Sequence, residues 1–328
     1  MDEVILATPE DKHAPLPTPF QRWFDQRGWS PHGHQLEMLA KAEAGRSALL
    51  IAPTGGGKTL AGFLPSLVAL AERGDNRGLH TLYISPLKAL TTDIARNLKA
   101  PIDEIGLAIR CETRTGDTPQ NRRQRQRQDP PDILLTTPES LALLLSYPDA
   151  PAIFDGLTTV VIDELHALAG TKRGQLLSLG LARLSGMSPG THYVGLSATV
   201  EKPTELIDFL SLGSEPAELV LGAPGPEPDV SILLPEGRLP WTGHYGTYAA
   251  PSLYHTIKSS RTTLVFVNTR AQAEVMFREL WRLNEDSLPI ALHHGSLAVE
   301  QRRKVEAAMA AGKLKAIICT SSLDLGID

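Results

Sequence analysis

The chain has few cysteines, no long apolar run and little net charge, although it is 328 residues long. Its two cysteines, Cys111 and Cys319, lie far apart and lack the spacing of metal ligands, so we expect two reduced thiols. No apolar run approaches the length of a membrane span, and residues 1–20 are acidic and rich in proline rather than signal-like. We therefore expect a cytoplasmic protein with no membrane partner.

The formal net charge of −5 argues against a surface that is basic throughout, but it leaves room for a local basic groove. One run is strongly basic, because residues 121–128 carry Arg122, Arg123, Arg125 and Arg127. Such a run predicts either a solvated helix face or direct contact with phosphates, and both interpretations stay open. The hydrophobic content of 42% and the length predict a globular chain with about two domains.

A glycine-rich loop dominates the N-terminal part of the sequence. The apolar run 48–51 leads into Ala52-Pro53-Thr54-Gly55-Gly56-Gly57-Lys58-Thr59, and a helix-like segment follows. A strand that turns through glycines into a helix directs backbone N–H groups at one point, which makes a phosphate site. In this pattern Lys58 reaches the β- and γ-phosphates, and Thr59 places its hydroxyl on Mg²⁺. The alternative is a glycine-rich turn with a chance lysine, and Ala52 stands where the motif usually has glycine.

Paired acids follow a later apolar strand, since Asp163 and Glu164 come directly after residues 158–162. At the carboxyl end of a strand, one carboxylate lies near the magnesium of the phosphate loop and the next lies beside an attacking water. Asp163 would hold Mg²⁺ through water, and Glu164 would orient or deprotonate the nucleophile. For either residue alone, the alternative is an acidic N-cap of the next helix.

Short apolar strands alternate with helices along the chain, which predicts an α/β fold with mostly parallel sheets covered on both faces. We expect a loose tail over 1–18, a first domain over 19–212, a linker rich in Gly and Pro over 213–228 and a second domain over 229–328. In such sheets the loops at the carboxyl ends of the strands build the site. The expected strands are 48–51, 80–84, 108–113, 132–136, 158–162, 192–196, 262–267, 290–294 and 315–319, and 230–234 opens the second α/β unit.

Two further polar elements are expected near this site. Gln35, one helix ahead of the phosphate loop, offers a donor and an acceptor to the edge of an adenine, although a glutamine on a helix is normally solvated. Ser197 and Thr199 follow the strand 192–196, and their hydroxyls can bond to groups beside Glu164 and His166. A hydroxyl-rich strand end is the alternative interpretation.

In this order the motifs resemble helicase superfamily 2, whose motor has two RecA-like parallel-sheet lobes in tandem. The resemblance covers about residues 20–328. Within the superfamily, residues 85–90, residues 163–166 followed by 170–174, and residues 321–328 look like the Lhr group, and more narrowly like the ligase-associated DEXH-box helicase. The matching motifs are Gln35 and residues 52–59, 85–90, 115–117, 136–140, 163–166, 197–199, 266–270, 293–296 and 320–328.

The resemblance implies an ATP-driven 3′-to-5′ translocase on single-stranded DNA that unwinds duplexes, including RNA:DNA hybrids, and is linked to DNA repair, with DNA-repair factors as partners. ATP and Mg²⁺ would bind between the lobes. The implied catalytic residues are Lys58, Asp163 and Glu164; those for coupling are His166, Ser197 and Thr199; those for the metal are Thr59 and Asp163. Gln35, Thr54, Gly55, Gly56, Gly57, Lys58, Thr59, Gly326 and Asp328 would bind the nucleotide. The nucleic-acid backbone would contact Pro86, Thr115, Gly116, Thr137, Pro138, Asn268, Arg270, His294, Gly295, Thr320 and Ser321.

One motif of the superfamily does not occur in this sequence, the arginine motif Gln-x-x-Gly-Arg-x-Gly-Arg. We therefore expect an incomplete second lobe in a chain that binds ATP but hydrolyses it weakly, because an arginine finger contributes roughly 10³–10⁵ in rate. An RNA-directed helicase of the same class is one alternative, since contacts to phosphates do not report the sugar. A non-hydrolysing, ATP-gated nucleic-acid clamp is the other; an intact Glu164 speaks against it and the missing arginine speaks for it.

Overall fold

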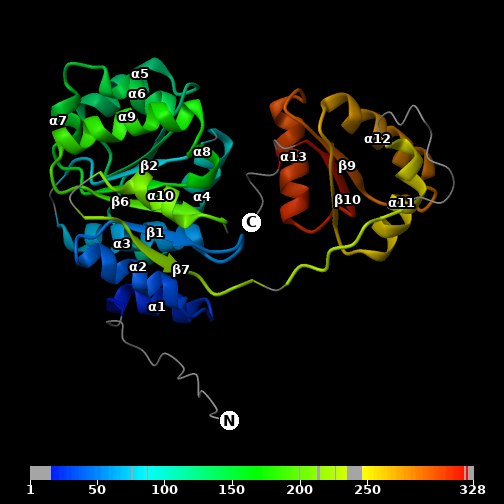
Figure 1. Cartoon of the computed structure of the whole chain (residues 1–328), viewed down its shortest axis with the longest axis horizontal. Helices are drawn as coiled ribbons and strands as arrows, with labels where there is room; N and C mark the ends of the chain where they lie inside the picture. Colours follow the sequence, from blue (N-terminus) through cyan, green and yellow to red (C-terminus); the bar gives the residue numbers. More distant parts are fainter. Residues whose placement is uncertain are drawn as a thin grey trace, which may run out of the picture. The chain divides into compact units, whose positions relative to one another are not determined.

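The computed structural model describes residues 16–74, 77–86, 88–198, 200–212, 215–225, 227–234, 246–320 and 323. The chain divides into two compact units near residue 226 (Figure 1). Among the described residues, no helix combines the length and the apolar character that a membrane crossing requires.

The first unit is built on a seven-stranded sheet with the order β3-β4-β2-β5-β6-β1-β7. Every neighbouring pair of strands in it is parallel, which confirms the predicted α/β class with parallel sheets. The strands are β1 (Ala48–Ile51), β2 (Thr81–Ile84), β3 (Cys111–Arg114), β4 (Ile133–Thr136), β5 (Thr159–Ile162), β6 (His192–Ser197) and β7 (Glu218–Leu221).

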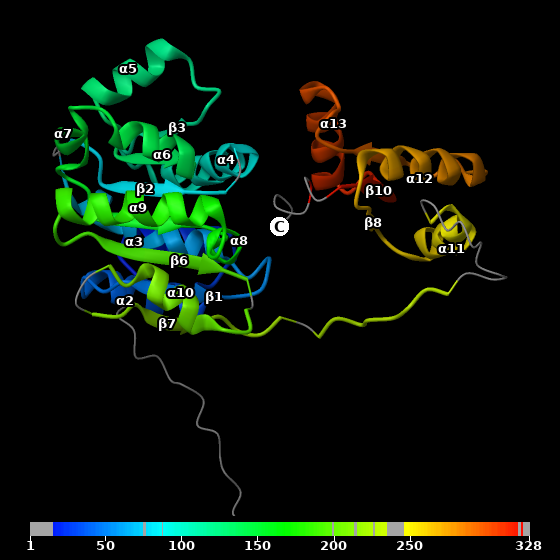
Figure 2. The same ribbon diagram turned by 45° about the horizontal axis from the view of Figure 1, so that its top comes forward.

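Helices cover both faces of this sheet, and alternate residues of each strand serve the two cores. Leu50 of β1 packs in one core, whereas Leu49 and Ile51 pack in the other. Figure 2 shows α9 and α10 on one side of the strands and α3 on the other. One face carries α1 (Thr18–Gln26), α2 (Gly33–Glu43), α3 (Lys58–Glu72) and α4 (Lys88–Ile105). The opposite face carries α6 (Pro138–Leu145), α7 (Ala150–Phe154), α8 (Leu165–Leu168), α9 (Lys172–Met187) and α10 (Pro203–Leu210).

The second unit has a three-stranded parallel sheet with the order β8-β10-β9. Its strands are β8 (Thr263–Phe266), β9 (Ile290–His293) and β10 (Ala316–Cys319). Alternation along β10 again divides the packing, since Ile318 contacts one core and Ile317 the other. The first core includes α11 (Ala250–Ser259) and α12 (Arg270–Leu283), the second includes α13 (Val299–Ala310), and the short helix η1 (Thr247–Ala249) precedes α11.

The structure differs from the expected linker over residues 213–228. Residues 218–221 form β7, which pairs with β1 from Ala48↔Glu218 to Ile51↔Leu221 and is an edge strand of the first sheet. Glycine and proline on both sides of this short strand gave the segment its linker composition, but the free backbone edge of β1 stabilises the added strand through ladder hydrogen bonds. Residues 230–234, expected to open the second unit, lie in neither a helix nor a strand.

A buried histidine gives the first unit a testable pH dependence. His80 is 6% exposed, and its Nδ1 lies 2.8 Å from Thr81 Oγ1. Burial, together with the charges of Arg73 and His192, lowers the pKa of His80 from 6.5 to about 4. The unfolded chain therefore binds the proton more readily, so the stability present above pH 6.5 is lost as the pH falls toward about 4.

We expect acidification from about pH 7.5 to about pH 5 to lower the free energy of unfolding of the wild type by about 2 kcal/mol more than that of His80→Gln. Glutamine cannot titrate, so this difference isolates His80 from other groups that titrate in the same range. Urea unfolding of both proteins at several pH values measures the difference. Parallel pH profiles for the two proteins would contradict a depressed pKa at His80.

Candidate nucleotide and nucleic-acid sites

The phosphate loop requires glycine at three successive positions, each for a geometric reason. Gly55 and Gly57 adopt φ values of +74° and +72°, a left-handed region that strains residues with a side chain. At Gly56, a Cβ would lie 2.8 Å from the Pro53 carbonyl oxygen, which itself accepts a hydrogen bond from Gly56 N–H at 3.0 Å. The loop ends where α3 begins at Lys58, so it leads directly into the N-terminus of a 15-residue helix. This geometry is that of a phosphate cradle.

Lys58 and Gln35 both contact this loop. The Lys58 side chain is 8% exposed, and its Nζ donates to the Ala52 carbonyl at 3.1 Å. Gln35 is buried; its Oε1 accepts from His32 N–H at 2.9 Å in the capping box of α2, and its Nε2 donates to the Gly57 carbonyl at 3.3 Å. Gln35 therefore ties the start of α2 to the phosphate loop. Its role toward adenine stays a prediction.

Asp163 lies at the end of β5, two strands from β1 in the sheet. It is 4% exposed, accepts a hydrogen bond from the Tyr83 hydroxyl through Oδ2, and accepts from Glu164 N–H through Oδ1 at 2.9 Å. Burial raises the pKa of Asp163 to about 6; the neighbouring Glu164 also raises it, whereas Tyr83 and Lys58 oppose the shift. A bound cation beside this carboxylate would favour its ionised form.

Glu164, His166 and Ser197 form a connected row beside the acid pair. His166 Nε2 lies 3.4 Å from Glu164 Oε2, and its Nδ1 lies 3.1 Å from Ser197 Oγ. Burial, with the charge of Lys58, lowers the pKa of His166, which favours the neutral ring. Glu164 has φ +47°, an uncommon conformation for a residue with a side chain, and it caps α8. The structure thus brings together three residues predicted for hydrolysis and coupling.

The residues around Lys58 fit a magnesium ion that is carried mainly by a nucleotide. Mg²⁺ prefers hard oxygen ligands and usually keeps several waters, bound through one or two protein groups and the phosphates. The Asp163 carboxylate and the Thr59 hydroxyl are such oxygens. No cluster of three or more His, Cys, Asp or Glu side chains that could hold a metal occurs in the described parts of the chain. A site completed by phosphates is consistent with this donor set.

The predicted nucleic-acid residues of the first unit follow the other strands of the same sheet edge. Pro86 follows β2, Thr115 and Gly116 follow β3, and Thr137 and Pro138 follow β4. Because the sheet order is β3-β4-β2-β5-β6-β1, these loops lie on one half of the edge, and the phosphate loop and Asp163 lie on the other. Parallel strands place all their carboxyl ends at one edge.

In the second unit, predicted contacts again follow the strands. Asn268 and Arg270 follow β8 and are exposed, as is Gly295 after β9, whereas His294 is buried with its Nε2 3.3 Å from Glu274 Oε1. Arg270 donates to the Ser296 hydroxyl, and Thr320 follows β10. Four further predicted residues, Thr199, Ser321, Gly326 and Asp328, lie outside the described residues.

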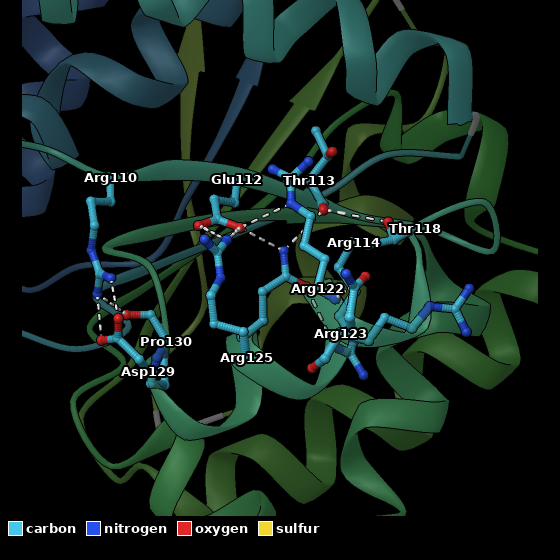
Figure 3. Close-up of polar contacts among 12 residues, drawn as sticks. Arg110, Glu112, Thr113, Arg114, Thr118, Arg122, Arg123, Arg125, Asp129 and Pro130 are labelled. Carbon is cyan, nitrogen blue, oxygen red and sulfur yellow. Dashed lines mark hydrogen bonds and ion pairs between the residues drawn. The ribbon is translucent and has the colours of Figure 1, made fainter.

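The arginine-rich run forms α5 (Gln120–Gln128), and its side chains bind other groups of the same unit. Arg122 and Arg125 both pair with Glu112 on β3 (Figure 3), and Arg127 pairs with Asp149 at 2.8 Å. These contacts favour the interpretation of α5 as a paired surface helix over direct phosphate contact by all four arginines. Burial raises the pKa of Glu112, but hydrogen bonds from Gln126 and Arg122, with the charge of Arg125, outweigh burial and lower the pKa.

Two residues support the site in ways that the sequence did not indicate: Tyr83 was not singled out, and Arg123 was named only as one member of the basic run. Tyr83 is fully buried within β2, stacks on Phe63 with ring centroids 4.6 Å apart, and donates to Asp163. Arg123 donates to the carbonyl oxygens of Thr115 and Gly116. The Tyr83 contact joins residues 80 positions apart, and nothing in the basic run distinguishes Arg123 from the other arginines. No local motif therefore indicates either contact.

Comparison with known families identifies both units. Residues 32–207 match the DEAD/DEAH box helicase model, and residues 249–328 match the helicase conserved C-terminal domain. The two units are therefore RecA-like lobes in tandem of a helicase motor. The chain belongs to the DEAD/DEAH box helicase family.

Its relatives include Lhr helicases. The chain is 34% identical to the Lhr helicase/probable uracil glycosylase of Mycolicibacterium smegmatis over 94% of its own length and 23% of that protein. It is 38% identical to the ATP-dependent helicase Lhr-Core of Methanothermobacter thermautotrophicus over 87% of its own length and 36% of that protein. The structure of Mycobacterium smegmatis helicase Lhr bound to ssDNA and AMP-PNP aligns with a TM-score of 0.81 and 35% identity, covering 95% of this chain and 42% of the other.

These similarities confirm the resemblance to superfamily 2 helicases of the Lhr group. The chain spans well under half the length of each relative, so the activities of those whole proteins do not transfer to it directly.

Proposed function

We propose that this chain is the motor portion of an ATP-dependent translocase that moves 3′ to 5′ on single-stranded DNA and unwinds DNA or RNA:DNA duplexes in DNA repair. One observation carries the proposal: the phosphate loop and Asp163–Glu164 lie on one half of a sheet edge whose other half presents the loops after β2, β3 and β4. Support comes from the Lhr neighbour, whose structure holds ssDNA and AMP-PNP. We place the protein in the cytoplasm, with DNA-repair factors as partners.

The chemistry assigned to the first lobe is positioning and electrostatics. Backbone N–H groups of residues 54–59 bind the β- and γ-phosphates, and Lys58 adds a positive charge. Glu164 orients the attacking water or accepts its proton. Asp163 and Thr59 would hold Mg²⁺, which neutralises charge that develops on the phosphates. The row from Glu164 through His166 to Ser197 links the hydrolytic acid to the end of β6 and so serves coupling.

The rate of hydrolysis by this chain is proposed to be low. Its sequence contains no Gln-x-x-Gly-Arg-x-Gly-Arg motif, and an arginine finger is worth roughly 10³–10⁵ in rate. Binding of ATP and nucleic acid is therefore the direct test of function, and hydrolysis is best followed in single-turnover assays.

We expect the purified chain to bind ATP with Mg²⁺. We also expect it to bind a thymidine oligonucleotide more tightly than a uridine oligonucleotide of the same length, a preference that follows from the proposed DNA substrate and not from the phosphate contacts. Fluorescence anisotropy of labelled oligonucleotides and of a labelled ATP analogue measures these affinities. Because the contacts are to phosphates, the logarithm of the DNA affinity should fall linearly with the logarithm of salt concentration.

Lys58→Ala serves as the matched control, since it should weaken ATP binding and leave DNA binding unchanged. Equal or tighter binding of the uridine oligonucleotide would favour an RNA-directed motor. Absence of binding to either oligonucleotide would contradict the proposal.

A further inference from the structure

The loop after β3 is held in a single folded turn by its own polar groups. Thr118 Oγ1 accepts from Thr115 N–H at 2.9 Å, Thr115 Oγ1 accepts from Asp117 N–H at 3.3 Å, and Thr118 N–H donates to the Thr115 carbonyl at 3.1 Å. Thr115 and Thr118 are nearly buried, whereas Gly116 and Asp117 are exposed. The turn therefore presents its two central residues to solvent at the carboxyl edge of the sheet.

Arg123 binds the backbone of this turn through its guanidinium. Its Nη2 donates to the Gly116 carbonyl at 2.5 Å and to the Thr115 carbonyl at 3.1 Å. Two carbonyl oxygens that would repel a phosphate are thus held by a guanidinium, which cannot lose its charge in a protein. With these carbonyls bound inside the unit, neither oxygen opposes an anion that approaches the exposed Gly116 backbone, whereas the exposed Asp117 carboxylate would repel one.

The other arginines of α5 do not share this role. Arg122 and Arg125 bind Glu112, and Arg127 binds Asp149 while its guanidinium lies 3.9 Å from the centre of the Tyr147 ring. Within the described residues, Arg123 is the arginine of α5 whose hydrogen bonds reach the turn. Its position on the helix, and not the charge of the run, distinguishes it.

A second arginine fixes the backbone that carries Arg123. Arg114, the last residue of β3, is 3% exposed and donates from Nη1 to the Arg123 carbonyl at 2.8 Å (Figure 3). Its own carbonyl accepts from Thr136 Oγ1 at 2.8 Å, at the end of β4. Strand, turn and helix are therefore linked by charge-assisted bonds, which are about twice as strong as neutral ones.

We propose that Arg123 is a positioning residue for nucleic-acid binding: it holds the turn at residues 115–118 in the conformation that faces a backbone phosphate, without contacting the phosphate itself. The inference rests on the proposed function, because it presupposes that Thr115 and Gly116 meet the nucleic-acid backbone. Pairing with carboxylates accounts for the other three arginines of α5, and positioning of the turn accounts for Arg123.

The test compares Arg123→Ala, Arg123→Lys and Arg125→Ala in binding to a thymidine oligonucleotide across a series of salt concentrations. Arg123→Ala should weaken binding about tenfold at each salt concentration, because two hydrogen bonds from a charged donor are lost. Lysine keeps the charge but lacks the fork that spans two carbonyls, so Arg123→Lys should fall between wild type and Arg123→Ala. Arg125→Ala removes the same charge from the same helix and should bind within about twofold of wild type.

The salt dependence distinguishes positioning from direct contact. Loss of a phosphate contact lowers the slope of log affinity against log salt by about 0.7 for a single strand, whereas loss of positioning leaves the slope unchanged. Amide hydrogen exchange in the free protein gives a second readout, and Arg123→Ala should speed exchange at Asp117 and Thr118, whose N–H groups donate within the turn. ATP binding should be unchanged in all three variants, which shows that the first unit is folded.

Wild-type affinity in Arg123→Ala, a lowered slope, or an equal loss in Arg125→Ala would each overturn the inference. If the wild type binds no oligonucleotide, the proposed function fails and the inference fails with it. If the wild type binds and Arg123→Ala binds equally well, only the inference fails.

Discussion

Replacing Glu164 by glutamine is expected to lower single-turnover ATP hydrolysis at least about 100-fold while leaving the affinity for ATP within about twofold of wild type. The amide keeps the size of the side chain but cannot accept a proton from water. Asp163, Lys58 and the three glycines proposed to bind the nucleotide remain in place. Hydrolysis measured with protein in excess over radiolabelled ATP, and binding measured with a fluorescent analogue, give the two quantities separately.

Glu205→Gln is the matched control for this experiment. Its side chain is 72% exposed on α10 and pairs only weakly, at 3.8 Å, with Lys202. Hydrolysis by this variant should equal that of the wild type. If Glu164→Gln also retained wild-type turnover, Glu164 would have no catalytic role.

The nucleotide half of the site could be predicted from sequence because it is encoded locally. Residues 52–59 and Asp163–Glu164 each follow one apolar strand, and the backbone direction at a strand end is fixed within a few residues. The structure adds the strand order that makes these segments neighbours: β1 and β5 are separated only by β6. A pattern of short strands predicts a parallel sheet but not its order, which depends on long-range packing.

The supporting contacts could not be predicted, because the fold and not a local motif sets the partner of each side chain. Tyr83 reads as an ordinary buried strand residue, and its bond to Asp163 spans 80 positions. The arginines of α5 look alike in sequence, yet one binds carbonyls of a turn and two share a single carboxylate. In physical terms, composition gives the charge of a segment, and only the fold decides which partner each charge meets.

The edge strand β7 was predicted wrongly, because it lies in a segment that has the composition of a linker and yet forms a strand. Residues 219–221 are all apolar, so the strand lacks the alternation of apolar and polar residues that is typical of a half-buried strand. Leu219 and Leu221 are exposed. Its stability comes from the β1 ladder and from Val220, which is fully buried. Short edge strands are stabilised by their neighbour more than by their own sequence.

The corner between α8 and α9 is tightly packed, and α8 follows the acid pair directly. A Cβ at Gly174 would lie 2.1 Å from the carbonyl oxygen of Leu168, which is the last residue of α8. That carbonyl accepts from the Thr171 hydroxyl at 2.7 Å, and Thr171 Oγ1 in turn accepts from Gly174 N–H at 3.1 Å as the N-cap of α9. A methyl group at Gly174 must therefore displace backbone, and it disrupts a cap in doing so.

Gly174→Ala is expected to lower the free energy of unfolding by about 3 kcal/mol, since overpacking against backbone costs about 1–3 kcal/mol and loss of the cap adds to it. For a unit of this size the melting temperature should fall by roughly 6–12 °C, measured by circular dichroism. Gly186→Ala on the same helix is the control: no atom lies within 4 Å of its Cβ position, so alanine should stabilise α9 by up to about 1 kcal/mol. Because α8 carries His166 and has Glu164 as its N-cap, Gly174→Ala should also slow hydrolysis at temperatures where it stays folded. Equal melting temperatures for the two variants would show that the corner accommodates a side chain and that α8 is not held by this contact.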